Sequence, residues 1–514
     1  MKRYLNTRVI AKVLGINLGL LSAALLICAG VALVLKEDTV PFLVSALITF
    51  LVALLLMPTG KDRRNLTDST NHKDLNRPDA YFTVTVSWVL MSLAGALPYL
   101  LSGSIPNVVD AVFESVSGFS TTGASILTDI EALPRSILFW RSLTHWIGGI
   151  GIIILVIVVM PSFKIGGYHL FTMESSLQQK IRPKTRSIGF NLLMIYVSLT
   201  VLEIIFLLAG GMSLYESVCH SFGTVATGGF SPKNTSIAGY SPYIQYVIAV
   251  FMLLAGVNFS LYFYLVRREF GKIQENQEFR LYLGMVAAIG AIITAAIFLN
   301  MNKSLEESFR EAFFQVISIL TCTGFATADY LVWPVYAWIL LFLAMFLGGS
   351  TGSTSGSIKM ARHLILWKNF RNIFRRMIHP TAVLPIRINN RHLSEDANQA
   401  AITFIALYMI VFVIGSFLLT LIGADPVTSV GSVATCMAGI GPGLGTTGPV
   451  SNFAHLPDTG KILLSMLMLL GRLEIYTVLI LFTGSFWTPR HARNKEFTVP
   501  YIKAPESIRY HGNK

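Results

Sequence analysis

The chain has 514 residues, with 40 Lys and Arg against 27 Asp and Glu, which gives a formal net charge of +13. Hydrophobic residues make up 53% of it and charged residues only 13%, whereas soluble domains hold about a quarter charged residues. The composition therefore excludes an ordinary soluble protein. Several apolar runs are long enough to cross a bilayer, and they predict a polytopic membrane protein: 13–35, 41–57, 188–211 and 462–483.

The N-terminal segment, MKRYLNTRVIAKVLGINLGLLSAALLICAGVALVL, has a basic start and a long apolar run. The run is too long for a signal peptide and lacks a small-x-small cleavage site, so we expect a retained first span. Five later segments are basic: KDRRNLTDSTNHK, QQKIRPKTR, RREFGK, KNFRNIFRR and PRHARNK. Alternate connections such as LKEDT and SLEESFREAF are acidic. The positive-inside rule then predicts cytoplasmic termini and cytoplasmic basic segments.

This charge pattern also bears on partners. Basic residues that set topology need no nucleic acid, so we expect no nucleic-acid partner. Anionic headgroups of the lipid bilayer and a cytosolic protein are secondary interpretations of the same charge.

Four short glycine-containing stretches recur, each between two long apolar runs: GFSTTGAS, ATGGFS, TCTGFAT and GIGPGLGTTG. Such self-similarity indicates an internal repeat. The alignment places four glycines in register: Gly123, Gly229, Gly324 and Gly443. Thirteen residues earlier the first three copies have an acid: Asp110, Glu216 and Glu311. The fourth copy has Val430 there and breaks the pattern.

The segment between acid and glycine is too short to span a membrane, and an acid at its start suits the positive end of a helix dipole. Each unit therefore predicts a span, a short re-entrant helix, a glycine turn and a second span. The expected first spans are 79–102, 188–211, 280–299 and 399–423. The expected second spans are 136–161, 243–266, 334–370 and 460–485. With two N-terminal spans, ten crossings result, and all four repeats run parallel.

The expected fold class is thus an all-α polytopic membrane protein, with two N-terminal transmembrane helices and four parallel span–pore helix–span repeats around one pseudo-fourfold ion pore. The expected segments are 1–72 (two helices and a cytoplasmic loop), 73–180 (repeat 1), 181–272 (repeat 2), 273–385 (repeat 3, with an intramembrane loop), 386–490 (repeat 4) and 491–514 (cytoplasmic tail).

Irregular backbone is tolerated at membrane depth only where it is buried in protein or lines a cavity. Four turns meeting on one axis would present rings of carbonyl oxygens, which replace the hydration shell of a monovalent cation. Glycine allows the φ values that such turns need. The alternative is that the glycines merely permit close helix packing. Four copies in register favour the carbonyl rings.

The whole chain resembles the Trk/Ktr/HKT potassium-uptake superfamily, most closely its Trk-type membrane (pore-forming) subunit. The matching motifs are the four turns, HWIGGIGIIIL, GGSTGSTSGSIK and LGRLEIYT. The resemblance implies potassium uptake across a bacterial cytoplasmic (inner) membrane through a gated, channel-like filter. It also implies a homodimer with one pore per subunit and a cytosolic RCK-type nucleotide-binding regulatory subunit. K⁺ is the transported ion, and no cofactor is implied in this chain.

The family's filter positions fall on the four glycines and the two residues before each. The implied potassium-binding residues are Thr121, Thr122, Gly123, Thr227, Gly228, Gly229, Cys322, Thr323, Gly324, Gly441, Pro442 and Gly443. Gly123 favours potassium, since some plant relatives with serine at this place favour sodium.

A polar run, GGSTGSTSGS, interrupts the second span of the third unit at 348–357. A broken helix at this depth is tolerated beside an aqueous path, and Ser and Thr can satisfy freed backbone groups. We expect a glycine-rich, flexible gating loop just below the filter, with no comparable break in the other units. The alternative is a cytoplasmic linker. The expected gate residues are Gly348, Gly349, Ser350, Thr351, Gly352, Ser353, Thr354, Ser355, Gly356 and Arg472.

Arg472 lies well inside the last span, where a charge is costly unless it faces a partner or a water-filled cavity. We expect it to project into the pore below the filter, at the level of the polar run, and to raise the barrier to cations; the resemblance supports that role. The alternative is a structural ion pair, although Glu474, two residues on, does not share its helix face. His145 is expected to serve in packing or hydrogen bonding, and Glu203 in helix packing or in transport.

Two other function classes compete. A secondary carrier would couple K⁺ to Na⁺ or H⁺ by alternating access, whereas a channel-like filter favours passive flux. A membrane enzyme is the weaker alternative: GGSTG at 348–352 satisfies G-x-S-x-G with Ser350, but that motif needs a strand before it and a helix after it. The four cysteines show neither CxxC spacing nor a His-Cys cluster, so no disulfide or zinc site is expected.

Overall fold

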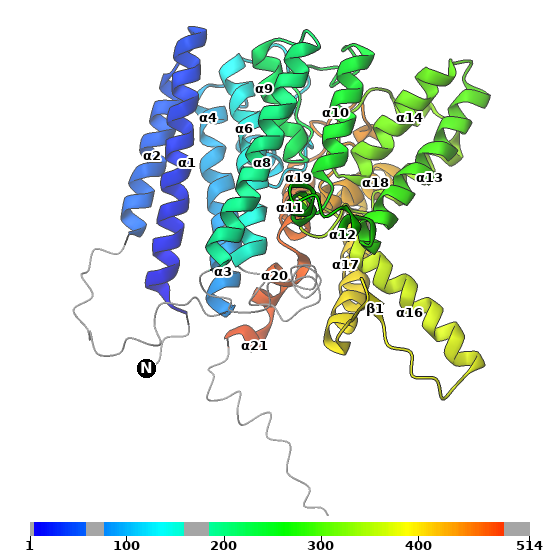
Figure 1. Cartoon of the computed structure of the whole chain (residues 1–514). Coiled ribbons are helices and arrows are strands. Elements are labelled where there is room, and N and C mark those ends of the chain that lie inside the picture. Colours follow the sequence, from blue (N-terminus) through cyan, green and yellow to red (C-terminus); the bar gives the residue numbers. More distant parts are fainter. Residues whose placement is uncertain (1–4, 58–76, 159–183, 488–514) are drawn as a thin grey trace, which may run out of the picture.

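The structure, a computed structural model, describes residues 5–57, 77–158 and 184–487. Helices stand side by side, with the N-terminal pair at one edge and α16 extending away at the opposite lower edge (Figure 1). In these ranges, five single helices and two bent helix pairs are long and apolar enough to cross a membrane. The basic segments at 61–73 and 489–495, most of the one at 178–186, and the tail at 491–514 lie outside the described residues.

The two expected N-terminal helices are α1 (Thr7–Leu35) and α2 (Val40–Leu56). They pack against each other along their length, and Ser22 Oγ donates a hydrogen bond to the carbonyl of Ala46 at 2.8 Å. Glu37, in the turn between them, accepts hydrogen bonds from two backbone N–H groups at the start of α6, at 2.9 and 2.8 Å. The pair is thereby attached to the first repeat.

The first spans of the four units follow the long apolar runs closely. They are α3 and α4 (Arg77–Gly95, Leu97–Leu101), α8 (Lys184–Ala209), α13 (Gln277–Asn300) and α17 (Glu395–Leu421).

Four short helices follow these spans: α5 (Val108–Phe119), α9 (Leu214–Val225), α14 (Leu305–Leu320) and α18 (Pro426–Ala438). Each has an N-cap residue whose side chain accepts a hydrogen bond from a first-turn N–H: Asn107, Ser213, Ser304 and Asp425. At 1.5 Å rise per residue they are too short to cross a bilayer about 30 Å thick. The prediction that Glu311 opens its helix is wrong, because α14 begins at Leu305 and its first-turn acids are Glu306 and Glu307.

The second spans differ from one unit to the next. Only α6 (Arg135–Val158) is one continuous helix. The others are divided: α10 and α11 (Pro242–Ala255, Phe259–Val266), α15 and α16 (Val335–Ala344, Met360–Ile378), and α19 and α20 (Asp458–Arg472, Ile475–Leu479). The first of these pairs bends by 99°, and the last, with the 3₁₀ turn Ile480–Phe482, bends by 113°.

The prediction that only the third unit is broken is therefore wrong. In the second unit, Asn258 begins a new helix by accepting a hydrogen bond from the N–H of Ser260. In the fourth unit, Glu474 has a φ of 63° and ends the helical path. Neither break interrupts the apolar pattern enough to be seen in hydropathy.

Short elements complete the fold. They are α12 (Phe270–Gln274), the 3₁₀ turns Tyr330–Val332 and Gly445–Thr447, the strands β1 (Arg387–Ile388) and β2 (Arg391–His392), and α21 (Gly484–Trp487). The antiparallel β1–β2 hairpin departs from a strictly all-α expectation. Its two turn residues, Asn389 and Asn390, have φ of 47° and 62°, as a tight hairpin turn requires.

The expected segment boundaries do not all fall between these elements. The boundary at 272 falls inside α12, and the one at 385 falls in the connection from α16 to β1. The boundaries near 72, 180 and 490 lie outside the described residues.

The short helices occupy the centre of the fold. Every residue from Phe113 to Thr122 is buried, and Trp140 of α6 packs edge-on against Phe119 at the end of α5. The fold therefore places the C-terminal ends of α5, α9, α14 and α18, and the turns after them, in its interior.

Candidate functional site

The four short helices are followed by turns with one shared backbone pattern. Two residues of positive φ stand two positions apart in every turn: Thr121 and Gly123, Thr227 and Gly229, Cys322 and Gly324, Gly439 and Gly441. The residue between them donates its N–H to a helix carbonyl five positions earlier: Thr122 to Ser117, Gly228 to Gly223, Thr323 to Ser318, and Ile440 to Thr435, at 2.8 to 3.0 Å. The four units thus build the same turn from different side chains.

The turns contact one another in a closed ring. A Cβ added to the last glycine of each turn would meet the next turn's backbone: Gly123 the carbonyl oxygen of Gly228 at 2.1 Å, Gly229 that of Thr323 at 2.0 Å, Gly324 that of Ile440 at 1.7 Å, and Gly441 that of Thr122 at 2.9 Å. Positive φ and these close approaches together require glycine at the four positions. We call Gly123, Gly229, Gly324 and Gly441 the ring glycines.

The ring corrects the predicted register of the fourth turn. Gly441, and not Gly443, is equivalent to Gly123, because α18 ends at Ala438 and the turn begins at once with Gly439. Gly443 lies outside the ring, where its carbonyl accepts a hydrogen bond from the Tyr330 hydroxyl at 2.6 Å. Gly439 and Ile440 therefore replace the predicted Pro442 and Gly443.

The residue nine positions before each ring glycine forms a hydrogen bond to the chain segment that follows the turn. The Glu114 carboxylate accepts from Ser125 Oγ and the N–H of Ile126, both at 3.0 Å; His220 Nε2 lies 3.0 Å from Ser231 Oγ; Gln315 Nε2 donates to the Ala328 carbonyl at 3.2 Å; Ser432 and Thr447 hydroxyls lie 2.9 Å apart. Sequence reasoning missed these residues, although in the first three units a polar residue nine positions before the glycine was a usable signal.

A buried ion pair supports the first two turns. Arg141 Nε lies 2.5 Å from Glu114 Oε1, and both side chains are almost fully buried. Arg141 also donates to the carbonyl of Ser231 at 3.1 Å, and its guanidinium lies 3.5 Å from the centre of the Phe230 ring. His145 Nδ1 lies 2.8 Å from the Gly118 carbonyl, and its ring stacks on Phe230, as expected of a packing residue.

The polar run 348–357, which we call the intramembrane loop, lies between α15 and α16 and is buried. It contacts the break of the second unit, where the Ser350 N–H donates to the Gly256 carbonyl at 2.9 Å and the Gly352 carbonyl accepts from the Phe259 N–H at 3.2 Å. Glycine content predicted flexibility, but the bonds show a loop fastened at several points. The two broken spans satisfy each other's freed backbone groups.

The loop also contacts the ends of the short helices. A Cβ on Gly356 would lie 2.1 Å from the carbonyl oxygen of Ala438, the last residue of α18. Thr354 Oγ1 donates to the carbonyl of Val225, the last residue of α9, at 3.0 Å. The loop is thus adjacent to the segments that carry the ring.

Arg472 makes no ion pair with a carboxylate in the described part of the chain. Its Nη1 donates to the Thr354 carbonyl at 2.7 Å, and its Nη2 to the Gly148 carbonyl at 3.3 Å. Glu474 pairs instead with Arg362 at 2.5 Å. Arg472 therefore lies beside the loop and binds backbone carbonyls in place of an acid.

A second cation, Lys359, was not predicted. Its Nζ donates to the Ser355 carbonyl and, at 3.4 Å, to that of Ser353. Together with Arg472, it occupies the carbonyls of three consecutive loop residues.

The enzyme motif finds no support in this geometry. Ser350 lies in a loop between two helices, without the strand–turn–helix of a nucleophile elbow, and its hydroxyl has no hydrogen-bond partner among the described residues.

These features define an all-α polytopic membrane transport protein with a central ring of re-entrant turns. Comparison with known proteins identifies the particular family: residues 49–488 match the family model "TrkH: Cation transport protein", and the chain belongs to that family. The predicted resemblance is thereby confirmed, and the transport class displaces the enzyme alternative.

Curated relatives cover nearly the whole chain. The Trk system potassium uptake protein TrkH of Escherichia coli is 34% identical over 496 residues, which are 94% of this chain and 100% of that protein. TrkG of E. coli is 33% identical over 490 residues, 94% of this chain and 99% of that protein. The crystal structure of the potassium transporter TrkH from Vibrio parahaemolyticus matches with a TM-score of 0.84 at 31% identity, covering 94% of this chain and 100% of that one.

Proposed function

We propose that this protein takes up potassium across a bacterial cytoplasmic membrane through a gated filter made of the carbonyl groups of the four turns. The observation that carries the proposal is the closed ring, in which four units place the same backbone turn around one centre. Carbonyl rings of this kind replace the hydration shell of K⁺. The relatives named above are potassium uptake proteins.

The filter residues follow from the ring register. They are Thr121, Thr122, Gly123, Thr227, Gly228, Gly229, Cys322, Thr323, Gly324, Gly439, Ile440 and Gly441. The C-terminal ends of the four short helices precede these residues, and their partial negative charge favours a cation nearby. The side chains differ among the units, which suits coordination by backbone rather than by side chains.

The intramembrane loop and Arg472 form the gate in this proposal. The loop lies against the ends of α9 and α18, and Arg472 and Lys359 hold its carbonyls. Two fixed positive charges in a low-dielectric setting raise the barrier to a permeating cation. Opening then requires the loop and Arg472 to separate.

Orientation and partners complete the proposal. Exposed basic residues follow α11 or lie on α12 and α16: Arg267, Arg268, Lys272, Arg371, Arg375 and Arg376. In Figure 1, α16 extends at the lower edge of the fold. The positive-inside rule makes this the cytoplasmic side, with both termini cytoplasmic. A homodimer and a cytosolic RCK-type regulatory subunit are the partners that the family implies.

The test is cation flux into liposomes containing the purified chain, with and without an RCK-type partner. We expect rubidium and potassium to enter faster than sodium, and the current to reverse at the potassium equilibrium potential at any pH. Reversal that shifts with sodium or proton gradients would favour the symporter alternative. Absence of any cation flux with the partner present would overturn the proposal.

A further inference from the structure

Glu278 joins α13 to the intramembrane loop and to the start of α16, the helix that follows it. The side chain lies in the first turn of α13 and is only 5% exposed. Its Oε1 accepts hydrogen bonds from the N–H of Thr351, at 2.6 Å, and of Ala361, at 3.1 Å. Thr351 lies in the intramembrane loop and Ala361 in the first turn of α16. One carboxylate therefore holds the loop and the helix that follows it.

The partners explain why an acid is buried here. The first N–H groups of a helix have no partner within it, and the positive end of the helix dipole favours a negative charge. Glu278, which belongs to α13, supplies the N-terminus of α16 with a hydrogen-bond acceptor and a negative charge. Lys359 and Arg362 lie at the same end of α16, and Arg362 is already paired with Glu474. The carboxylate thus binds the N-terminus of α16 and the loop at the same time.

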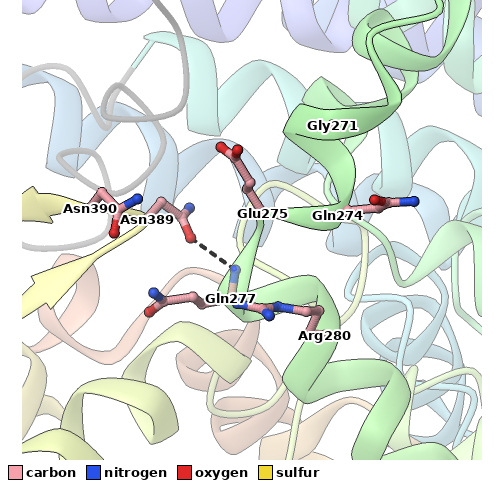
Figure 2. Close-up of a pocket in the computed structure, with 7 residues that line it drawn as sticks. All are labelled: Gly271, Gln274, Glu275, Gln277, Arg280, Asn389 and Asn390. Carbon is pink, nitrogen blue, oxygen red and sulfur yellow. Dashed lines mark hydrogen bonds between the residues drawn. The ribbon is translucent and has the colours of Figure 1, made fainter.

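Gln277, the residue before Glu278, links the Glu278 contacts to the cytoplasmic surface. The N–H of Gln277 donates to Asn389 Oδ1 of the β1–β2 turn at 2.8 Å, a bond that Figure 2 shows. Lys368 of α16 donates both to Gln277 Oε1 and to the Arg387 carbonyl. The hairpin, α16 and the start of α13 therefore meet at Gln277.

A cavity of about 280 Å³ separates the hairpin turn from α12 and the start of α13 (Figure 2). Its lining residues are mostly polar: Gly271, Gln274, Glu275, Gln277, Arg280, Asn389 and Asn390. The Gln277–Asn389 bond crosses its wall. The Gln277–Asn389 bond, which joins the hairpin to α13, thus lies beside open space.

We propose that Glu278 is the positioning residue that holds the intramembrane loop closed under the ring, and that the hairpin acts on it through Gln277. This inference rests on the proposed function, because it assigns the regulation of the same gate. The hydrogen bonds that Glu278 makes among the described residues go to the loop and to α16, so its loss changes how often the gate opens and not which ion the filter prefers.

Glu278→Ala removes the oxygen that accepts both hydrogen bonds, and Glu278→Gln keeps an oxygen in the same place. In liposomes without the regulatory partner, we expect Glu278→Ala to raise rubidium flux about tenfold, the factor that corresponds to about 1.4 kcal/mol from one charge-assisted hydrogen bond. Glu278→Gln should stay within about twofold of the unaltered chain. The ratio of rubidium to sodium flux should be the same in all three.

A purely structural role predicts another pattern, in which both variants lose stability and flux together. Equal effects of Ala and Gln, or unchanged partner-independent flux in a folded Glu278→Ala protein, would overturn the inference. Should Glu278→Ala not purify, Glu278→Asp provides the same comparison, because it keeps the charge but is too short to reach both N–H groups.

The role of the hairpin is tested with Asn389→Gly. This change removes the side-chain oxygen that accepts from the Gln277 N–H, and glycine tolerates the positive φ of the turn. Asn390→Gly is the matched control, at the adjacent position of the same turn. We expect Asn389→Gly alone to weaken the response to the partner, with no further effect in the Glu278→Ala background. Additive effects of the two changes would show that the hairpin acts by another route.

Hydrogen exchange separates this inference from the proposed function. Glu278→Ala should speed amide exchange across residues 348–361, whether or not any flux is measured. A chain without cation flux but with faster exchange in the variant would overturn only the proposed function. Unchanged exchange would overturn the role given to Glu278.

Discussion

The ring and the intramembrane loop are both non-helical backbone inside a helical membrane protein, but they are held in different ways. Each turn of the ring bonds to its own short helix five residues earlier, and its last glycine contacts the next turn. The loop is held by groups distant in sequence: Glu278, Arg472, and carbonyls of the second unit. The turns of the ring are therefore held by hydrogen bonds within their own repeats, whereas the loop is held by hydrogen bonds to residues distant in sequence.

This difference suits a fixed filter and a movable gate. Removing a hydrogen bond to a charged group costs about 1.5–3 kcal/mol. A change of about 5.5 kcal/mol moves a two-state equilibrium from mostly closed to mostly open. Two or three of the loop contacts thus suffice to control opening, and none of them belongs to the ring.

Breaking the ring should have the largest effect. Gly441 has a φ of 97°, and its added Cβ would lie 2.9 Å from backbone atoms of the first turn. We expect Gly441→Ala to abolish rubidium uptake, because the side chain forces the first and fourth turns apart. Pro442→Ala, the matched change one residue on, should keep more than about half of the uptake, since Pro442 lies outside the turn. An inactive Pro442→Ala with an active Gly441→Ala would restore the original register.

Removing the loop should have the next largest effect. Deletion of 350–355 eliminates the contacts to Glu278, Arg472 and Val225 together. We expect partner-independent flux to rise by at least about tenfold, since several bonds of about 1 kcal/mol each are lost. Uptake is measured with and without the partner, and the unaltered chain is the control. Flux that is unaltered, or still fully dependent on the partner, would contradict a gating role.

The sequence contains enough information for the ring of the first three units. Their motifs share one spacing, and the acids and glycines align without gaps. The fourth turn is ambiguous, because GIGPG offers two glycine pairs, and the short helix has to end before the correct pair is known. The ring contacts of Ile440 decide between the two pairs, and those contacts are tertiary.

The loop contacts were beyond sequence reasoning for a related reason. Hydropathy predicted the spans well, but it does not detect the bends near Asn258 and Glu474, which depend on partners elsewhere in the fold. Glu278 resembles an ordinary first-turn acid in the sequence ENQEFR. Only the folded chain brings the N–H groups of Thr351 and Ala361 to it.

Changing Arg472 separates its charge from its bonds. Arg472→Ala removes the donors to the Thr354 and Gly148 carbonyls as well as the charge, and we expect partner-independent flux to rise several-fold, about what the loss of one charge-assisted bond gives. Arg472→Lys keeps the charge but lacks the planar group that reaches two carbonyls. Flux in the Lys variant close to that of Ala would assign the effect to the bonds, and flux close to the unaltered chain would assign it to charge. Unchanged flux in Arg472→Ala would remove this residue from the gate.

The smallest expected effect compares a contact inside the loop with one that leaves it. Thr354→Val removes the hydroxyl that donates to the Val225 carbonyl while keeping the side-chain shape, and we expect about a threefold rise in partner-independent rubidium flux from the loss of one neutral hydrogen bond. Ser353→Ala removes a hydroxyl that donates to the Ser350 carbonyl at 2.6 Å, a bond between two residues of the loop itself. Its flux should stay within about twofold of the unaltered chain, because a bond that moves with the loop does not oppose its displacement. If Ser353→Ala opens the gate as far as Thr354→Val, the internal shape of the loop, rather than its attachment to the second unit, controls opening.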